Sequence, residues 1–100
     1  MPDQVHKETV FKQIGAKIIY YRKLRELTQE ELAGLSHISS STLGKIERGK
    51  YNHNVSVAVL IDIACGLDID FSTLFDFNEV EKEMWIDKDL SHHIKQKRKE

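Results

Sequence analysis

The sequence predicts an all-α protein, a bundle of five helices with an additional helix near the C-terminus. Apolar residues recur at intervals of three and four in residues 9–26 and again in residues 56–67, which is the period of a helix with one buried face. Residues that cap helix N-termini, Thr28, Ser39 and Ser56, stand immediately before three of the expected helices.

The first helix is expected to cover residues 9–26, after a flexible polar arm formed by residues 1–8. Its buried stripe consists of Val10, Phe11, Ile14, Ile18 and Tyr21. Gly15 costs about 1 kcal/mol relative to alanine inside a helix, so we expect it to allow the close approach of a neighbour. Ile19 and Tyr20 fall outside the stripe, and either lie singly on the surface or are covered by a later helix or a second subunit.

Two short helices at a tight angle are predicted next. Thr28 is followed three residues later by Glu31, a spacing in which each residue can satisfy a backbone N–H of the other. The helical period breaks at residues 36–38, and Ser39 can cap a second helix that ends at Gly49. On this second helix Leu43 and Ile46 point one way, and Ser40, Ser41, Gly44 and Lys45 point the other. A short helix with a small, polar and cationic outer face suits a groove, which is the arrangement of a helix-turn-helix.

A fourth helix is expected to start after Ser56, with an apolar stripe formed by Leu60, Ile63, Ala64 and Leu67. Cys65 has apolar neighbours and no second thiol in the chain. We therefore expect a small core or half-buried residue there rather than a nucleophile.

The remaining residues complete one domain and extend beyond it. Asp70 can cap a short fifth helix that ends at Phe75, so the helix-turn-helix domain spans residues 9–76. Residues 77–90 are predicted to form the additional helix, used for packing or dimerisation, because its narrow apolar face needs a partner. Residues 91–100 are expected to be a flexible basic tail.

Charge is distributed unevenly in a chain whose formal net charge is −1. Residues 1–50 hold nine Lys and Arg against six Asp and Glu (+3), residues 62–89 two against nine (−7), and residues 95–100 four against one (+3). Because a local basic face neutralises phosphates whatever the net charge, nucleic acid is an acceptable partner. An acidic surface kept for solubility explains the same numbers.

The composition also excludes several classes of protein. No apolar run approaches the ~20 residues that a membrane span needs, and the start MPDQVHKE has no apolar signal region. The single cysteine fits a reducing compartment, so we expect a cytoplasmic protein. We expect no enzyme, because no nucleophile with a base, paired carboxylates or phosphate-binding glycine loop is present. We also expect no cofactor and no metal, since Asp89, His92 and His93 would form at most a weak site.

Residues 14–75 resemble the lambda-repressor/Cro (Xre) family of DNA-binding domains. The specific segments are RKLRELTQEELA, the ending IERG of the second short helix, and LIDIACGL. The resemblance implies a five-helix, lambda-repressor-like helix-turn-helix bundle whose third helix enters the major groove of double-stranded DNA. It also implies a two-fold homodimer on a pseudo-palindromic operator.

The resemblance implies roles for individual residues. It places Ser40, Ser41, Gly44 and Lys45 against bases, and Gln29, Thr42, Arg48 and Lys50 against backbone phosphates. Arg22 and Glu47 match an ion pair between the first and third helices, which their positions on those helices also suggest. Lysine is a donor suited to guanine, whereas two serines discriminate poorly between bases.

The sequence departs from the family pattern at three places. His37 stands where the turn often has glycine, so some backbone strain is expected. Gly44 stands where the family has a residue that carries a side chain. The glycine opens space at the groove and removes one side chain that could contact a base. The loop from Gly49 to Ser56 is longer than the common pattern.

The leading prediction of function is a sequence-specific transcriptional regulator, a repressor that binds its operator as a dimer. An alternative is an antitoxin-like interaction module that neutralises a protein partner and regulates its own gene through the same domain. The acidic residues 62–89 would suit a basic partner of that kind.

Overall fold

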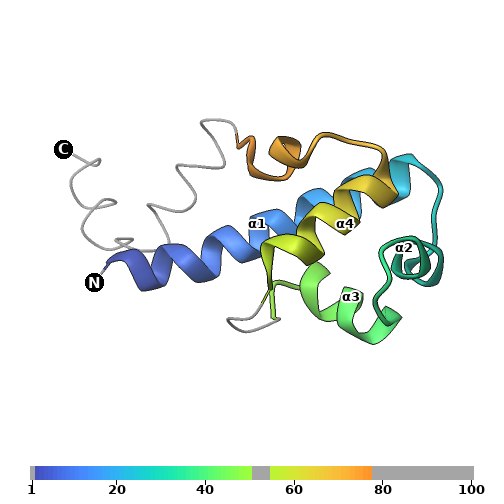
Figure 1. Ribbon diagram of the computed structural model, residues 1–100. Coiled ribbons are helices and arrows are strands. Elements are labelled where there is room, and N and C mark those ends of the chain that lie inside the picture. Colours follow the sequence, from blue (N-terminus) through green and yellow to red (C-terminus); the bar gives the residue numbers. More distant parts are fainter. Residues whose placement is uncertain (1, 51–54, 78–100) are drawn as a thin grey trace.

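The structure, a computed structural model, describes residues 2–50 and 55–77, and this part of the chain is helical and contains no strand. Its elements are α1 (Pro2–Leu24), α2 (Gln29–Leu35), α3 (Ser40–Glu47), α4 (Val57–Leu67) and the 3₁₀ helix η1 (Phe71–Phe75). Figure 1 shows α1 along the length of the molecule, with α4 beside it and with α2 and α3 grouped on one side. The all-α helix-turn-helix prediction is confirmed.

One predicted boundary is wrong. α1 begins at Pro2 rather than near Thr9, so the segment expected as a flexible arm is helical from its second residue. Proline is favourable in the first turn of a helix, and no glycine or proline follows it until Gly15. The short fifth helix ends at Phe75 as predicted and is a 3₁₀ helix, but the Asp70 side chain does not make the capping hydrogen bond that was expected. The predicted helix 77–90 and tail 91–100 lie outside the described residues, apart from Phe77, which is buried.

The predicted N-caps of α2, α3 and α4 are confirmed. Thr28 Oγ1 accepts from the N–H of Glu31 at 3.0 Å, while the Thr28 N–H donates to Glu31 Oε1 at 2.8 Å. Ser39 and Ser56 accept in the same way from the N–H groups of Thr42 and Val59, at 3.0 and 3.1 Å. Each cap satisfies an N–H group that has no partner inside its helix, so the three helices begin where the sequence predicts.

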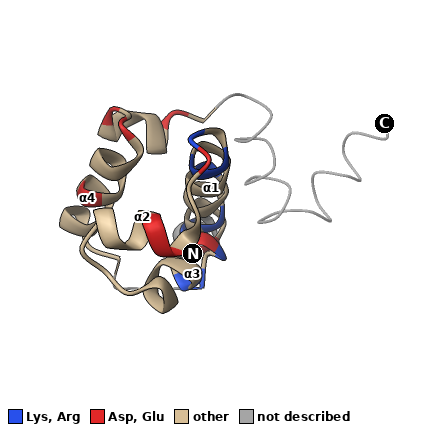
Figure 2. Ribbon diagram, turned by 90° about the vertical axis from the view of Figure 1, so that its right-hand side faces the viewer, with Lys and Arg blue, Asp and Glu red and all other residues tan. Residues whose placement is uncertain are grey.

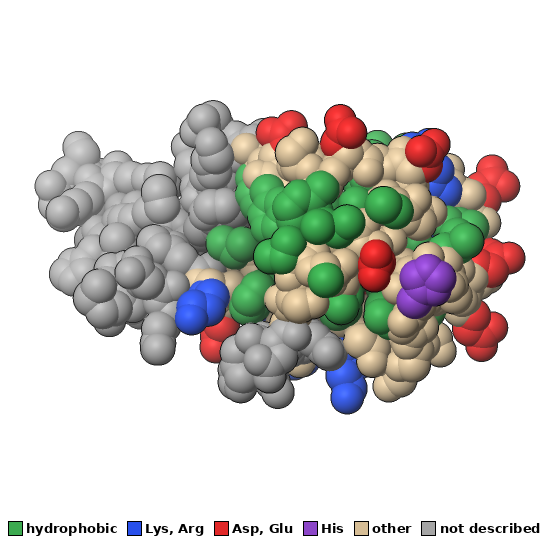
Figure 3. Space-filling view, viewed as in Figure 1, with side chains coloured by type: hydrophobic (Ala, Val, Ile, Leu, Met, Phe, Trp, Pro, Cys, Tyr) green, Lys and Arg blue, Asp and Glu red, His purple; other side chains and the backbone are tan. Residues whose placement is uncertain are grey.

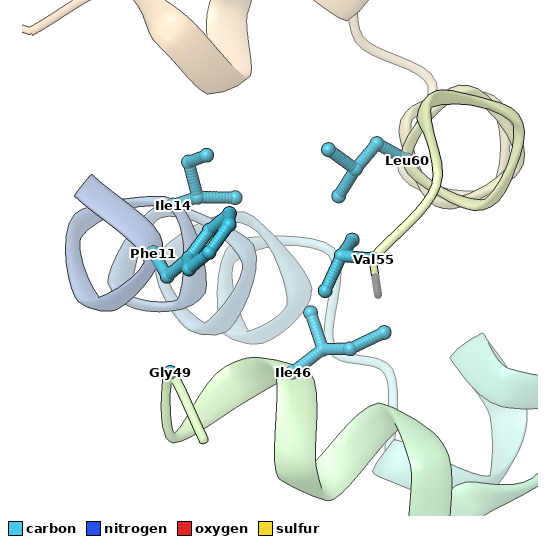
Figure 4. Close-up of a pocket in the computed structure, with 6 residues that line it drawn as sticks. All are labelled: Phe11, Ile14, Ile46, Gly49, Val55 and Leu60. Carbon is cyan, nitrogen blue, oxygen red and sulfur yellow. The ribbon is translucent and has the colours of Figure 1, made fainter. Parts of the chain in front are cut away.

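The core draws on all five elements. The largest fully buried apolar side chains are Ile18, Leu32, Leu43, Ile63, Leu67 and Leu74. Between α1, α3 and α4 the core leaves a small hollow, to which Phe11, Ile14, Ile46, Gly49, Val55 and Leu60 contribute (Figure 4). Its side chains are all apolar, so the hollow belongs to core packing and offers no group that could orient a polar ligand.

Cys65 is exposed, so the prediction of a core or half-buried position is wrong. The core side of α4 carries Leu60, Ile63, Ala64 and Leu67. Cys65 follows Ala64 by one residue, and a step of one residue turns the side chain by about 100° to the outer side of the helix. Apolar neighbours in the sequence therefore did not indicate burial.

Each of the four α-helices is followed within two residues by a residue with positive φ. Glu26, His37 and Asp68 have φ values of 60°, 63° and 58°, and Gly49 has 70°. The left-handed conformation expected at His37 is confirmed. The N–H of Ile38 then donates to Ala33 O at 3.0 Å, which closes the turn between α2 and α3.

Ser36 leads to a prediction about stability. Its side chain is fully buried at the end of α2, and its Oγ has no hydrogen-bond partner within the described structure. An unpaired hydroxyl costs about 1–3 kcal/mol to bury, so Ser36→Ala should raise the free energy of unfolding by about 1 kcal/mol. Urea denaturation followed by circular dichroism measures the change. The exposed Ser72→Ala should shift stability by less than about 0.5 kcal/mol, and a Ser36→Ala protein less stable than this control would contradict the prediction.

Candidate nucleic-acid interface

The outer face of α3 carries the residues that the sequence assigns to DNA bases. Ser40, Ser41 and Lys45 are exposed, while Leu43 and Ile46 beneath them are 0% and 3% exposed. The described chain does not cover these three polar side chains. An isolated helix of this length is marginal in water, so the buried side chains are what keep the polar face in place.

An ion pair joins the end of α3 to α1. Arg22 Nε donates to Glu47 Oε2 at 2.7 Å, and Arg22 Nη2 donates to Glu47 Oε1 at 3.2 Å. The Glu47 side chain is 2% exposed and that of Arg22 is 13% exposed. The third guanidinium nitrogen, Nη1, donates to the carbonyl oxygen of Leu27 at 3.0 Å. The structure thus contains the predicted pair, with the two-pronged geometry that suits arginine and a carboxylate.

The same carboxylate also holds Gln29, a contact that was not predicted from the sequence. Gln29 Nε2 donates to Glu47 Oε1 at 2.8 Å, so α1, α2 and α3 are connected through one buried group. A carboxylate can accept several hydrogen bonds, and a side-chain amide nitrogen carries two hydrogens. The second hydrogen of Gln29 Nε2 is therefore available to an external acceptor such as a phosphate oxygen.

The prediction that Gly44 lies open on the outer face of α3, facing the bases, is wrong. It is buried. A β-carbon at this position would lie 3.3 Å from Arg48 Nη1 and 3.7 Å from Gln29 Nε2. The side chains of Arg48 and Gln29 cover the glycine, so Gly44 itself presents no side chain and little surface to a base.

The C-terminal end of α3 is held against α1. Gly49 has a left-handed backbone, and a β-carbon there would lie 2.8 Å from the α-carbon of Lys12. The N–H groups of Gly49 and Lys50 donate to the carbonyls of Ile46 and Lys45 at 3.0 and 2.9 Å, which satisfies the end of the helix. Only glycine fits both the backbone conformation and the contact with α1.

Three exposed cations, Lys45, Arg48 and Lys50, form a cationic ledge at the end of α3. Thr42 is half-buried, and its Oγ1 accepts from Ser39 Oγ at 2.9 Å. The Thr42 hydroxyl hydrogen is free to point outward. The residues predicted to contact phosphate thus include one amide, one hydroxyl and two cations on the surface near α3.

Charge and apolar surface are separated on the molecule. Figure 2 shows Lys and Arg on α1 and α3, whereas the charge on α4 is acidic. Hydrophobic side chains gather on the face that carries α4 and η1 (Figure 3), where Val57, Ile61 and Phe75 are exposed.

No cluster of residues in the described part of the chain could hold a metal ion. None of the described helices is long and apolar enough to span a membrane.

An exposed polar helix, supported by a second short helix across a tight turn, defines a helix-turn-helix domain. Residues 18–74 match the model of the Helix-turn-helix family HTH_3, and the chain belongs to this family.

The chain is also similar to individual proteins that are named as repressors or regulators. It is 31% identical over 91 residues to an immunity repressor protein of Bacillus phage phi105, in a match that covers 87% of this chain and 63% of the phage protein. It is 36% identical over 63 residues to an uncharacterized HTH-type transcriptional regulator of Methanocaldococcus jannaschii, in a match that covers 63% of this chain and 96% of that protein.

Solved structures show the same fold. The restriction-modification controller protein C.AhdI from Aeromonas hydrophila superposes with a TM-score of 0.61 at 35% identity, over 65% of this chain and 96% of the controller. An HTH_3 family transcriptional regulator from Vibrio cholerae gives 0.62 at 35% identity, over 69% of this chain and 38% of that one.

Proposed function

We infer that this protein is a DNA-binding regulator of transcription that inserts α3 into the major groove. The observation that carries this function is the exposure of Ser40, Ser41 and Lys45 directly above buried Leu43 and Ile46. The similarity to regulators of this family supports the same function. Its site of action is DNA inside the cell, which fits the cytoplasmic location expected from the sequence.

The residues divide between bases and backbone. Ser40, Ser41 and Lys45 are proposed to contact base edges, because they are exposed on one side of α3. Gln29, Thr42 and Lys50 are proposed to contact phosphates, and so to fix the orientation of α3 in the groove. Arg48 lies beside them on the cationic ledge.

We propose that the protein acts as a homodimer on a pseudo-palindromic operator and represses transcription. The similarity to a phage immunity repressor supports repression. The exposed apolar side chains of Val57, Ile61 and Phe75 offer a surface that a second copy could cover, and Tyr20 on α1 is 60% exposed. A dimer would place its two α3 helices in half-sites about 34 Å apart. A separate protein partner, as in the antitoxin-like alternative, stays a prediction that co-purification would test.

Selection of bound sequences from a pool of random duplexes tests this function. The expected result is one enriched sequence with two inverted half-sites. The absence of any enriched sequence, with no binding to random DNA at low salt, would contradict the function. A single unpaired half-site would contradict the dimer alone.

Two substitutions separate the proposed base contacts from the phosphate contacts. Lys45→Ala should cost about 1–3 kcal/mol on the selected site and relax the preference at one base pair. Gln29→Ala should weaken binding to all sequences alike, since a phosphate contact carries no base information. Titrations at several salt concentrations measure both effects, with a wild-type slope near −0.9 for each phosphate neutralised. A changed base preference in Gln29→Ala would contradict its phosphate role.

A further inference from the structure

The guanidinium of Arg48 lies over Gly44, one helical turn closer to the N-terminus of α3 than its own backbone. A β-carbon at Gly44 would be 3.3 Å from Arg48 Nη1, and 3.7 and 3.8 Å from Nε2 and Oε1 of Gln29. Helical side chains lean toward the helix N-terminus, so residue 48 covers the surface above residue 44. Because glycine has no side chain, this surface is open to arginine.

The position of Gly44 makes this placement important. Residue 44 lies on α3 between Ser41 and Lys45, in the part of the helix that is proposed to face the bases. Gly44 has no side chain that could contact a base, and the residue is buried. The groups that occupy its place at the surface are the Arg48 guanidinium and the Gln29 amide.

The Arg48 guanidinium and the Gln29 amide differ in whether their hydrogen-bond donors are already used within the protein. Gln29 Nε2 is engaged by Glu47, and the other arginine near α3, Arg22, is tied to the same carboxylate. The Arg48 side chain makes no hydrogen bond or ion pair with any residue in the described part of the chain, and the residue is exposed. Its donors form a planar fork whose spacing matches O6 and N7 of guanine, the pair of acceptors that arginine most often binds in the major groove.

We propose that Arg48 reads a guanine in the major groove, through the space that the missing side chain of Gly44 leaves above α3. This inference rests on the proposed function and replaces the phosphate contact that the family resemblance implies for Arg48. Gln29 keeps its proposed phosphate role.

The test compares Arg48→Ala with Lys50→Ala, which removes the same charge from the other side of Gly49. Binding of the full chain is measured on the selected operator, on operators with each base pair changed in turn, and on random duplex DNA. Arg48→Ala should lose roughly 5- to 150-fold in affinity for the operator and become indifferent to one G·C pair in each half-site. Lys50→Ala should weaken binding to operator and random DNA alike and reduce the salt slope by about 1, with every base preference kept.

Two further variants keep the test independent of folding. Arg48→Lys retains the charge without the fork, and should weaken the preference for the same G·C pair more than it weakens binding to random DNA. Gly44→Ala adds a methyl group 3.3 Å from Arg48 Nη1, so the guanidinium must shift, and the preference at that pair should change while circular dichroism shows a folded protein. Uniform weakening by Arg48→Ala, with no base pair relaxed in any variant, would overturn the inference. A different result would contradict the proposed function: the wild-type protein would select no sequence at all from the random duplexes.

Discussion

Replacing Glu47 by alanine should lower the free energy of unfolding by about 3–5 kcal/mol, the usual cost of removing one partner from a buried ion pair. Arg22 Nε and Nη2 would lose both of their contacts with Glu47, while the Arg22 side chain stays largely buried. Gln29 Nε2 would lose its acceptor as well. Since a domain is stable by only about 5–15 kcal/mol, thermal and urea denaturation should show a large shift of the midpoint.

Two control proteins show whether the stranded charge is the cause. Glu8→Ala removes an exposed carboxylate from α1 and should change stability by less than about 0.5 kcal/mol. The double variant Arg22→Met with Glu47→Leu replaces both charges by apolar groups, and should recover much of the loss. If Glu47→Ala behaves like Glu8→Ala, the pair does not hold the first three helices together. If the double variant is as unstable as Glu47→Ala, the loss of stability comes from lost packing and not from the unpaired charge.

The features that were predictable from the sequence are those that depend on local spacing. Thr28, Ser39 and Ser56 cap helices because each stands directly before an amphipathic segment, and the structure shows all three capping bonds. The ion pair between Arg22 and Glu47 was predictable because both positions follow from the helical period once the helices are placed. Resemblance to a known family then suggested which face of α3 is the functional one.

The features that the sequence did not predict depend on how elements meet. Spacing within α3 places Gly44 on the outer face, but its burial arises from Gln29 on another helix and from Arg48 one turn later. The contact between Gln29 and Glu47 likewise joins residues of two helices whose relative position no local pattern specifies. The early start of α1 had a local signal, Pro2, that a polar composition concealed.

Gly15→Ala should be among the most destabilising single substitutions in the described chain. A β-carbon at Gly15 would meet the backbone of α3, at 2.6 Å from the carbonyl oxygen of Ile46 and 2.8 Å from the carbonyl carbon of Glu47, and closer still to the Glu47 carbonyl oxygen. A backbone cannot turn aside as a side chain can, so α1 and α3 must separate. Forced overpacking costs about 1–3 kcal/mol and occasionally more, and we expect a loss of about 3 kcal/mol in urea denaturation.

Gly34→Ala is the matched control, because it makes the same chemical change in α2 where no heavy atom lies within 4 Å of the new methyl group. Alanine is the better helix former by about 1 kcal/mol, so this variant should be more stable than the wild type. The two substitutions then have opposite signs, and the difference between them measures the cost of the contact between α1 and α3 with helix propensity removed. A stabilising Gly15→Ala would mean that α3 does not approach α1 as closely as the structure shows, and the support for the DNA-facing residues of α3 would have to come from α2 and α4 alone.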